Sequence, residues 1–436
     1  MHKTPIISGM QVTYQRNIAE RAAGALERFP IVAIQGARRV GKSTLAASLV
    51  ANRPHVLVTL DDSEQLDLAV HDPKGFLMQG GDAVMVIDEV QRAPDLLLAI
   101  KASVDADTRP GRYVLTGSSD FTTLAKVPDS LAGRAITIQL GGLSQGELMG
   151  LREDFCTTML DDPATLAQDS QWTRADYIAA VTAGGYPELR FLEEPWRTLW
   201  ADSYIDRLTS RDIADVAGRL PGARVRAVLG MLAANQSGEL VKARLADLAQ
   251  IPERSITRCV EALEALYVIA RLQPWTANLT KRQVGRTKAI ILDSGLATHL
   301  VGATASWLTQ PAGSKTLGMI VEGFVDAELL KQQSWSSQRW QLEHFRDRAG
   351  LEVDSVIRLA DGRVILIEVK ASHTYRREHM SAITALADQL GDHLAAGVVL
   401  TLSEHAWRFG DKLWGLPISA LWGHARPVDE EQTAPD

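Results

Sequence analysis

The residues best suited to chemistry form the motif GARRVGKS at positions 36–43, which has the pattern G-x-x-x-x-G-K-[ST]. An apolar run at residues 31–34 precedes the motif, and a helical pattern over residues 44–50 follows it. Glycines let backbone N–H groups close around phosphate oxygens, and the N-terminus of the following helix adds partial positive charge. In such a loop the lysine reaches the β- and γ-phosphates, and the hydroxyl residue completes a Mg²⁺ shell. We therefore expect ATP to bind to Gly36, Ala37, Arg38, Arg39, Val40, Gly41, Lys42, Ser43 and Thr44, with Mg²⁺ on Ser43.

Two adjacent carboxylates, Asp88 and Glu89, follow an apolar run at residues 83–87. A carboxylate that leaves a parallel strand beside a phosphate loop can hold hydrated Mg²⁺, which is the role we expect for Asp88. The next carboxylate, Glu89, can polarise the attacking water. A solvated turn is the alternative explanation of this pair.

A third short strand is predicted at residues 113–115, and it ends in the small polar residues TGSS at 116–119. Hydroxyl groups at this position could sense the γ-phosphate of a bound nucleotide. A plain polar turn would give the same sequence.

The strand order, the Asp88-Glu89 pair, the LTGSS strand end and LAGR at residues 131–134 together resemble an AAA-type P-loop ATPase. More narrowly, they resemble prokaryotic ATPases that carry a C-terminal winged-helix and nuclease-like region. The resemblance implies that Ser118, or else Thr116, is the sensor residue. It also implies that Arg134 is an arginine finger acting in cis or in trans, with a structural ion pair as the alternative. Arg16 is implied to be an arginine on the base side of the nucleotide.

The spacing of apolar runs predicts an α/β protein with several parts. Residues 1–142 alternate short apolar runs with helical patterns, which is typical of a parallel sheet with crossover helices. Residues 143–222 are predicted to form a helical lid, and residues 223–300 a winged helix with a basic connector. The lid also contains GGYPE at residues 184–188, a family motif whose role the sequence does not indicate. The buried anchors expected in the lid are Trp172, Trp196, Leu199, Trp200, Tyr204 and Leu208.

The predicted winged helix consists of helices at residues 225–234, 242–250 and 252–266, followed by a wing strand at 267–272. Such modules bind DNA or proteins. Outward basic residues would favour DNA, whereas Glu261 and Glu264 would repel phosphates. The local candidates for a DNA contact are Arg254, Ser255 and Arg258 on the third helix, and Lys281, Arg282, Arg286 and Lys288 in the connector, which could equally be a solvated loop.

A second set of acids lies in the C-terminal part, at residues 301–426. Glu322 is in a helical segment, Asp354 in a predicted hairpin, and Glu368 and Lys370 in the strand motif IEVK. Residues two apart in a strand share one face, so Glu368 and Lys370 project together. The order of helix, strands, helix and strand resembles the core of the restriction-endonuclease-like superfamily. That resemblance implies a Mg²⁺ site on Glu322, Asp354 and Glu368, with Lys370 acting on the attacking water.

The alternative for this acidic set is a salt-bridged, decayed nuclease core that binds DNA or a partner without cutting. The sequence does not decide between the two. The short polar segment at residues 427–436 is expected to be a flexible tail.

Composition narrows the setting of the protein. A chain of 436 residues is expected to form two to four domains. No apolar stretch reaches the roughly 20 residues that cross a bilayer, and the N-terminus lacks a secretory pattern. Cys156 and Cys259 form no metal or disulfide pattern. We expect a cytoplasmic protein without a membrane partner, and the net charge of −7 restricts any DNA contact to a local patch.

Two functions remain after these observations. The first is a Mg²⁺-dependent ATPase coupled to DNA binding or processing. The second is a nucleotide-dependent switch or scaffold whose nuclease-like domain is inactive and binds protein. Either could act as a homo-oligomer if Arg134 reaches a neighbouring subunit.

Overall fold

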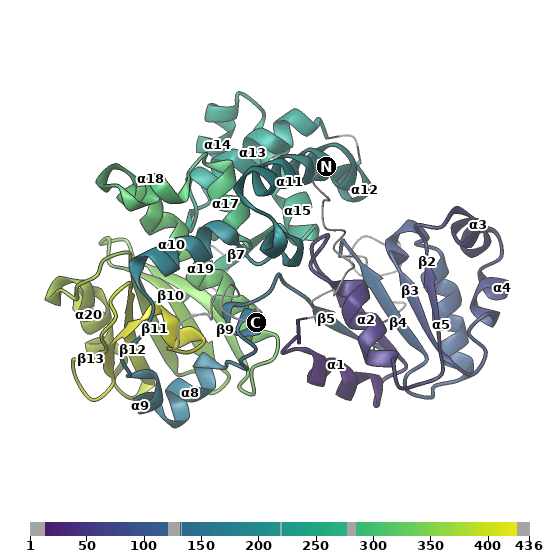
Figure 1. Cartoon of the computed structure of the whole chain (residues 1–436), viewed down its shortest axis with the longest axis horizontal. Coiled ribbons are helices and arrows are strands. Elements are labelled where there is room, and N and C mark those ends of the chain that lie inside the picture. Colours follow the sequence, from purple (N-terminus) through teal and green to yellow (C-terminus); the bar gives the residue numbers. More distant parts are fainter. Residues whose placement is uncertain (1–13, 121–130, 132, 219, 277–284, 425–436) are drawn as a thin grey trace, which may run out of the picture.

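Two sheets organise the chain in the computed structural model, which describes residues 14–120, 131, 133–218, 220–276 and 285–424 (Figure 1). The N-terminal sheet is parallel, and its strand order is β2-β3-β4-β1-β5. Short helices connect its strands and cover it (Figure 1). The elements of this part are α1 (Ala19–Leu26), β1 (Ile31–Gln35), α2 (Lys42–Val50), β2 (His55–Thr59), α3 (Ser63–His71), α4 (Pro73–Met78), β3 (Val84–Asp88), α5 (Leu96–Ala106), β4 (Tyr113–Gly117) and β5 (Ala135–Gln139).

The register of this sheet brings the predicted nucleotide residues to one edge. Gln35 at the end of β1 lies opposite Gly117 of β4 and Gln139 of β5. Because all five strands run in the same direction, the carboxyl ends of β1, β3 and β4 meet at this edge. Ligands of open parallel sheets bind outside such carboxyl ends. Every residue of β1 is buried, which fits a central strand covered on both faces.

The helices that follow the parallel sheet divide between two cores, although we expected residues 143–222 to form one lid. Residues of α8 and α10 share a core with α19 and the C-terminal strands. By contrast, α11 and α12 contribute to a core with helices α13 to α15 and with one face of the N-terminal sheet. The elements are α7 (Gln145–Leu148), α8 (Phe155–Asp161), α9 (Pro163–Leu166), α10 (Arg174–Ala183), α11 (Glu194–Arg207) and α12 (Ile213–Ala217).

Two of the expected lid anchors are exposed. Trp196 is 61% exposed and Leu199 58% exposed, so their predicted burial is wrong. Trp196 lies in the first turn of α11, and the packing contacts of that helix begin a turn later. There Trp200 stacks on Tyr204, with ring centroids 5.0 Å apart. Trp196, Trp200, Tyr204 and Leu208 are four residues apart, and this interval identified the correct helix face. It did not show where along the helix the packing against neighbouring elements begins.

Five helices and a small antiparallel sheet make up the described part of residues 222–309. The strands have the order β7-β8-β6, and β8 pairs with both of its neighbours. The predicted helices are present, and the strand expected at 267–272 begins two residues later. The elements are α13 (Gly222–Ala234), β6 (Gly238–Glu239), α14 (Lys242–Ala249), α15 (Glu253–Ala265), β7 (Ile269–Pro274), β8 (Lys288–Ile291), α17 (Ser294–Leu300) and α18 (Ala305–Thr309).

Strand β7 continues the small sheet into the C-terminal strands through a parallel pairing with β9. Within the described residues this joined sheet has nine strands in the order β13-β14-β12-β11-β10-β9-β7-β8-β6. The elements are α19 (Ser314–Gln333), β9 (Trp340–Arg346), β10 (Glu352–Leu359), β11 (Val364–Lys370), α20 (Ser381–Leu390), β12 (Leu394–Thr401), β13 (Trp407–Arg408) and β14 (Leu413–Pro417). The expected order of helix, strands, helix and strand is therefore present.

Two further expectations concern the whole chain. No helix among the described residues is long and apolar enough to span a membrane. Both cysteines are buried and free, so they form no disulfide.

Candidate functional site

The loop between β1 and α2 has a backbone that only glycine accommodates at two points. Gly41 has φ of +96°, in the left-handed region where a Cβ is disfavoured. A Cβ on Gly36 would lie 2.0 Å from the carbonyl oxygen of Leu140, so the loop passes directly against the segment that follows β5. Helix α2 begins at Lys42, immediately after the loop. Its first N–H groups therefore face the loop, as anion binding requires.

Lys42 is held against the loop itself. Its ammonium donates to the carbonyl oxygen of Ala37 at 2.9 Å, and the side chain is buried. Burial lowers the pKa of Lys42 from its ordinary value, while the nearby carboxylates of Glu89 and Asp88 oppose that shift. The ammonium of Lys42 therefore lies near the predicted catalytic acid Glu89 and the predicted metal ligand Asp88.

Ser43 and Asp88 meet as a Mg²⁺ pair should. The Ser43 hydroxyl donates to Oδ1 of Asp88 at 2.8 Å, and the Thr116 hydroxyl bonds to the same oxygen. Ser43 is exposed, and Asp88 is partly exposed. Mg²⁺ favours a few protein oxygens together with phosphate and water. These residues fit such an ion, which would supply charge neutralisation of the phosphates.

Glu89 lies beside a small polar network that the sequence did not reveal in full. Its backbone has φ of +59°, an uncommon conformation for a residue with a side chain. The Ser118 hydroxyl donates to Oε2 of Glu89 at 3.0 Å. The amide of Gln91 donates to the Ser118 hydroxyl at 2.9 Å and also bonds to Glu89. Of the two sensor candidates, Ser118 thus contacts Glu89, and Thr116 contacts Asp88 through its side chain.

Lys42, Ser43, Asp88 and Glu89 line a cavity of about 950 Å³, a size suited to a nucleotide. Its far wall comes from the segment around GGYPE. Glu188 of that motif pairs with Arg39 of the loop at 2.6 Å and accepts from Nε1 of Trp200 at 2.9 Å. Because Arg39 and Glu188 lie far apart in the sequence, no local pattern predicts this ion pair. Cavity residues to which the sequence assigned no role include Tyr14, Gln15, Asp61, Pro187, Glu188 and Phe191.

Arg16 lines the same cavity but uses its donors within the protein. It donates to the carbonyl oxygen of Val40 at 2.9 Å and to that of Gly141 at 2.8 Å, and it pairs with Glu147 at 3.1 Å. It therefore ties the loop to the segment after β5. A direct contact of Arg16 with the base remains a prediction.

Arg134 lies at the opposite end of the sheet from the loop of its own chain. It precedes Ala135, which pairs with Ile31 at the start of β1, whereas the loop follows Gln35 at the other end. Five residues of strand span roughly 13 Å. Nε of Arg134 lies 2.5 Å from Oδ1 of Asp105. A role in cis does not fit this position, and a role on a neighbouring molecule stays a prediction.

The predicted residues of the second acidic set also come together, but two lysines hold them. Lys370 on β11 pairs with Glu368 at 2.5 Å and lies 3.7 Å from Oδ2 of Asp354. Lys288 on β8 pairs with Glu322 at 2.9 Å and donates to the carbonyl oxygen of Asp354 at 3.2 Å. Burial, followed by the Asp354 charge, raises the pKa of Glu322 to about 8 and that of Glu368 to about 7.

No group of three or more His, Cys, Asp or Glu side chains within the described ranges could hold a metal ion. The arrangement gives no support to the Mg²⁺ site on Glu322, Asp354 and Glu368, which stays a prediction from the sequence. One oxygen of Asp354 accepts from the backbone N–H of Val369 at 2.8 Å. Lysine ammonium groups lie against the carboxylates where a cation would bind, so the residues do not fit a metal here.

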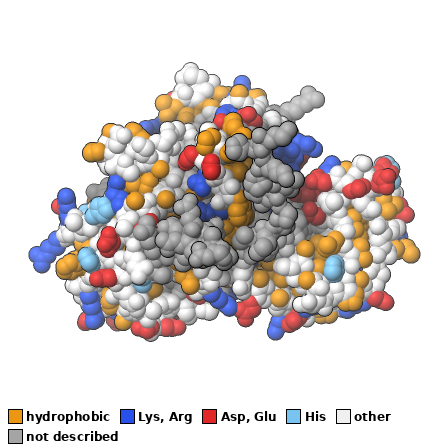
Figure 2. All heavy atoms as spheres, viewed as in Figure 1, with side chains coloured by type: hydrophobic (Ala, Val, Ile, Leu, Met, Phe, Trp, Pro, Cys, Tyr) orange, Lys and Arg blue, Asp and Glu red, His pale blue; other side chains and the backbone are white. Residues whose placement is uncertain are grey.

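Lys288 was expected to contact DNA as part of the connector. This expectation is wrong, because Lys288 is buried in these ion pairs. Arg286 is exposed but lies 3.4 Å from Glu239. Lys281 and Arg282 fall outside the described residues. On the face in Figure 2, basic side chains are interspersed with acidic ones, and no continuous basic stripe of described residues crosses it.

Comparison with known proteins supports the assignment of the N-terminal part. An AAA domain matches residues 28–149, and domains of unknown function match residues 174–306 (DUF8612) and 317–421 (DUF4143). The uncharacterized proteins Mb2031c of Mycobacterium bovis and Rv2008c of Mycobacterium tuberculosis are each 28% identical over 411 residues, which cover 93% of this chain and 84% of theirs.

Among solved structures, the Walker-type ATPase paby2304 of Pyrococcus abyssi aligns with a TM-score of 0.42 at 16% identity, over 66% of this chain and 96% of that one. The AAA match covers the loop, Asp88, Glu89 and the end of β4. Residues 28–149 of this chain are thus similar to an AAA domain, and the P-loop lies within the matched range.

Proposed function

We propose that the chain hydrolyses ATP to ADP and phosphate with Mg²⁺ in the cavity beside α2. The observation that carries this proposal is the convergence of Lys42, Ser43, Asp88 and Glu89 from separate elements onto that cavity. Lys42 contacts the β- and γ-phosphates, and Ser43 and Asp88 hold the hydrated ion. Glu89 orients and polarises the attacking water, and Ser118 positions Glu89.

The experiment that tests this proposal compares wild type with Lys42→Ala and Glu89→Gln in a phosphate-release assay with ATP and Mg²⁺. Hydrolysis should fall in both variants by about a hundredfold or more, because each removes a charge that acts on the reacting phosphate or water. Arg363→Ala is the matched control, since Arg363 pairs only with Asp361 in an exposed turn far along the chain. Full turnover in either test variant would remove the assignment.

We further propose that nucleotide state is passed to the rest of the chain as a switch. Two side-chain contacts connect the surroundings of the phosphate loop directly to later parts of the chain. The Tyr267 hydroxyl donates to Oε1 of Gln35 at 2.6 Å, immediately before the phosphate loop. Arg39 of the loop pairs with Glu188, as described above. Movement of the loop on hydrolysis would therefore act directly on two elements outside the ATPase domain.

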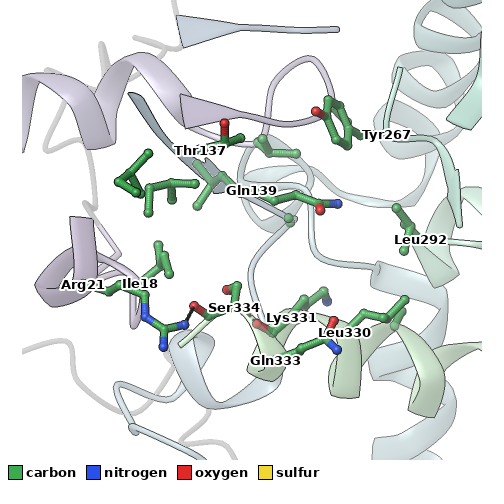
Figure 3. Close-up of a pocket in the computed structure, with 18 of the residues that line it drawn as sticks. Ile18, Arg21, Thr137, Gln139, Tyr267, Leu292, Leu330, Lys331, Gln333 and Ser334 are labelled. Atoms are coloured by element: carbon green, nitrogen blue, oxygen red, sulfur yellow. Dashed lines mark hydrogen bonds between the residues drawn. The ribbon is translucent and has the colours of Figure 1, made fainter. Parts of the chain in front are cut away.

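Room for such movement exists between the parts. A cavity of about 630 Å³ lies between α1 and β5 on one side and the end of α19 on the other, and Tyr267 also lines it. Figure 3 shows Thr137 and Gln139 on one side and Leu330, Lys331 and Gln333 on the other, with Arg21 bonded across to Ser334. Two parts separated by a cavity can shift against one another more readily than two that share a packed interface.

The remaining parts, in this proposal, are a winged helix and a restriction-endonuclease-like domain that contacts a partner without cutting. Helices α13 to α15 with strands β6 to β8 have the element order of a winged helix. The acids of the C-terminal part are held by lysines, which favours the scaffold over the nuclease. DNA processing is the competing function. Cleavage of DNA in the presence of Mg²⁺ or Mn²⁺, abolished by Asp354→Ala with ATP hydrolysis retained, would establish it instead.

A further inference from the structure

Lys288 is the first residue of β8, and its ammonium lies among oxygen atoms of two other elements. The nearest are Oε1 of Glu322 on α19 at 2.9 Å, the carbonyl oxygen of Asp354 on β10 at 3.2 Å, and Oε1 of Glu352 at 3.5 Å. The Lys288 side chain is 2% exposed. Lysine is seldom buried to this degree unless it is paired. The ammonium of Lys288 and its oxygen partners thus form an ion-pair cluster without a metal.

The backbone of Lys288 cannot move away from this position easily. Lys288 lies opposite Leu272 of β7 and Glu239 of β6, so it sits in the middle of the small antiparallel sheet. Withdrawal of the side chain would require either a different rotamer into packed protein or loss of strand pairing. The ammonium is therefore fixed among the acids by the fold of the neighbouring part.

The other half of the cluster is filled in the same way. Lys370 lies against Glu368 and Asp354, and Asp354 also accepts from a backbone N–H. A divalent ion entering between these acids would approach two ammonium groups within a few ångströms, where repulsion in a poorly solvated site is strong. Mg²⁺ also gives up its water reluctantly. Both effects favour the lysines over a metal.

We infer that the ammonium of Lys288 takes the place of a metal ion in the C-terminal acidic cluster, so that the cluster is an ion-pair joint between β8 and the C-terminal sheet and binds no divalent cation. The joint connects the small antiparallel sheet to α19 and β10. This inference needs no step of ATP hydrolysis. It explains why acids in nuclease-like order come together without forming a metal site.

The test measures Mn²⁺ binding to the nucleotide-free full chain by electron paramagnetic resonance. All variants carry Asp88→Asn, which removes the carboxylate ligand of the phosphate-loop ion. The parent Asp88→Asn should bind no Mn²⁺, whereas addition of Lys288→Met should create a Mn²⁺ site. Further addition of Glu322→Gln should abolish the new site. Addition of Lys288→Arg to the parent keeps the charge and should create no site.

The inference is overturned if the parent binds Mn²⁺ and Glu322→Gln removes that binding. It is equally overturned if folded Lys288→Met protein gains no Mn²⁺ site. If Lys288→Met alone does not fold, the double variant Lys288→Met/Glu322→Gln removes the unpaired charge, and thermal denaturation decides. If that double variant folds, the result supports the ion-pair joint. If neither the double variant nor Lys288→Arg folds, the charge of Lys288 is not what stabilises the fold, and the inference is contradicted. ATP hydrolysis is not a readout of this test, because Asp88→Asn is expected to remove it in every variant; the proposed function is tested separately with Lys42→Ala and Glu89→Gln.

Discussion

The two acidic sites of the molecule differ in what holds their carboxylates. At the phosphate loop, Asp88 accepts from the neutral hydroxyls of Ser43 and Thr116, beside a cavity open to solvent. In the C-terminal part, Glu322 and Glu368 are paired with lysines. Carboxylates held by neutral groups keep their charge available to an incoming cation. Carboxylates already paired with an ammonium do not.

This comparison teaches that acids in the right element order do not by themselves make a metal site. Both sets were indicated by residue type and spacing. Only the environment of each set, built from residues far away in the sequence, distinguishes them. Lys288 is the clearest case, because it comes from a different sheet segment than any of the acids that it contacts.

The largest expected difference between the sites is in ATP turnover. Glu89→Gln should lower hydrolysis by about 10²- to 10⁴-fold, because the amide cannot polarise water as a carboxylate does. The matched change in the other site, Glu368→Gln, should leave hydrolysis unchanged. Steady-state phosphate release with both purified proteins measures this. Equal losses in the two variants would mean that the C-terminal acids belong to the same catalytic process.

The next effect is on the free energy of unfolding, and it compares the two lysines of the C-terminal acidic set. The Lys288 side chain is 2% exposed, and Lys288→Ala leaves the carboxylates of Glu322 and Glu352 without their cation. Breaking such a buried pair typically costs about 3–5 kcal/mol of unfolding free energy. The Lys370 side chain is 34% exposed, so Lys370→Ala removes a hydrated cation and should cost about 1 kcal/mol or less. Urea denaturation followed by tryptophan fluorescence compares them. A cost for Lys288→Ala no greater than that for Lys370→Ala would contradict the ion-pair joint.

A smaller effect is expected from the network beside Glu89. Gln91→Ala removes the amide that bonds to both Ser118 and Glu89, so Glu89 loses orientation but keeps its charge. Hydrolysis should fall by about tenfold, which corresponds to roughly 1.4 kcal/mol of activation free energy. The loss should appear in kcat, with the KM for ATP retained. A change confined to KM would place Gln91 in binding.

A further buried acid, Glu153, is held by neutral groups. Its partners are the neutral Ser144 and Asn17. Burial raises the pKa of Glu153 from its ordinary 4.5 to about 8. Because the folded pKa is the higher one, the stabilising contribution is full below pH 4.5 and is lost as pH rises through about 8. The melting temperature should therefore decline between pH 5 and 9, and by less in Glu153→Gln. Parallel curves for the two proteins would contradict the shifted pKa.

Much of the nucleotide site could be predicted because its parts are local in sequence. The loop at residues 36–43 and the acids after β3 each follow a strand, and a parallel sheet brings strand ends together without further information. Gln91 also follows this strand but has no pattern that separates it from a surface residue. Glu188, Phe191 and Tyr14 approach the loop only through the folding of distant segments, so their roles could not be predicted.

The helical elements were predicted more reliably than their packing. A helical pattern was expected in the region of α11, but the spacing of its apolar residues did not reveal that Trp196 projects beyond the core. The division of residues 143–222 between two cores has the same origin, because periodicity shows which face is apolar and not which element covers it. For Arg134, the resemblance implied an arginine finger, and a structural ion pair was the alternative. The structure shows Arg134 paired with Asp105 on α5, a contact that no local pattern indicates.

The central claim is that the loop of residues 36–43 encloses the phosphates of ATP together with Mg²⁺. Calorimetric titration of the full chain with ATP tests it most directly, with and without Mg²⁺, in wild type, Lys42→Ala and Glu89→Gln. The account predicts Mg²⁺-dependent binding in wild type and Glu89→Gln, and its loss in Lys42→Ala. Absence of binding in wild type, or undiminished binding in Lys42→Ala, would contradict it.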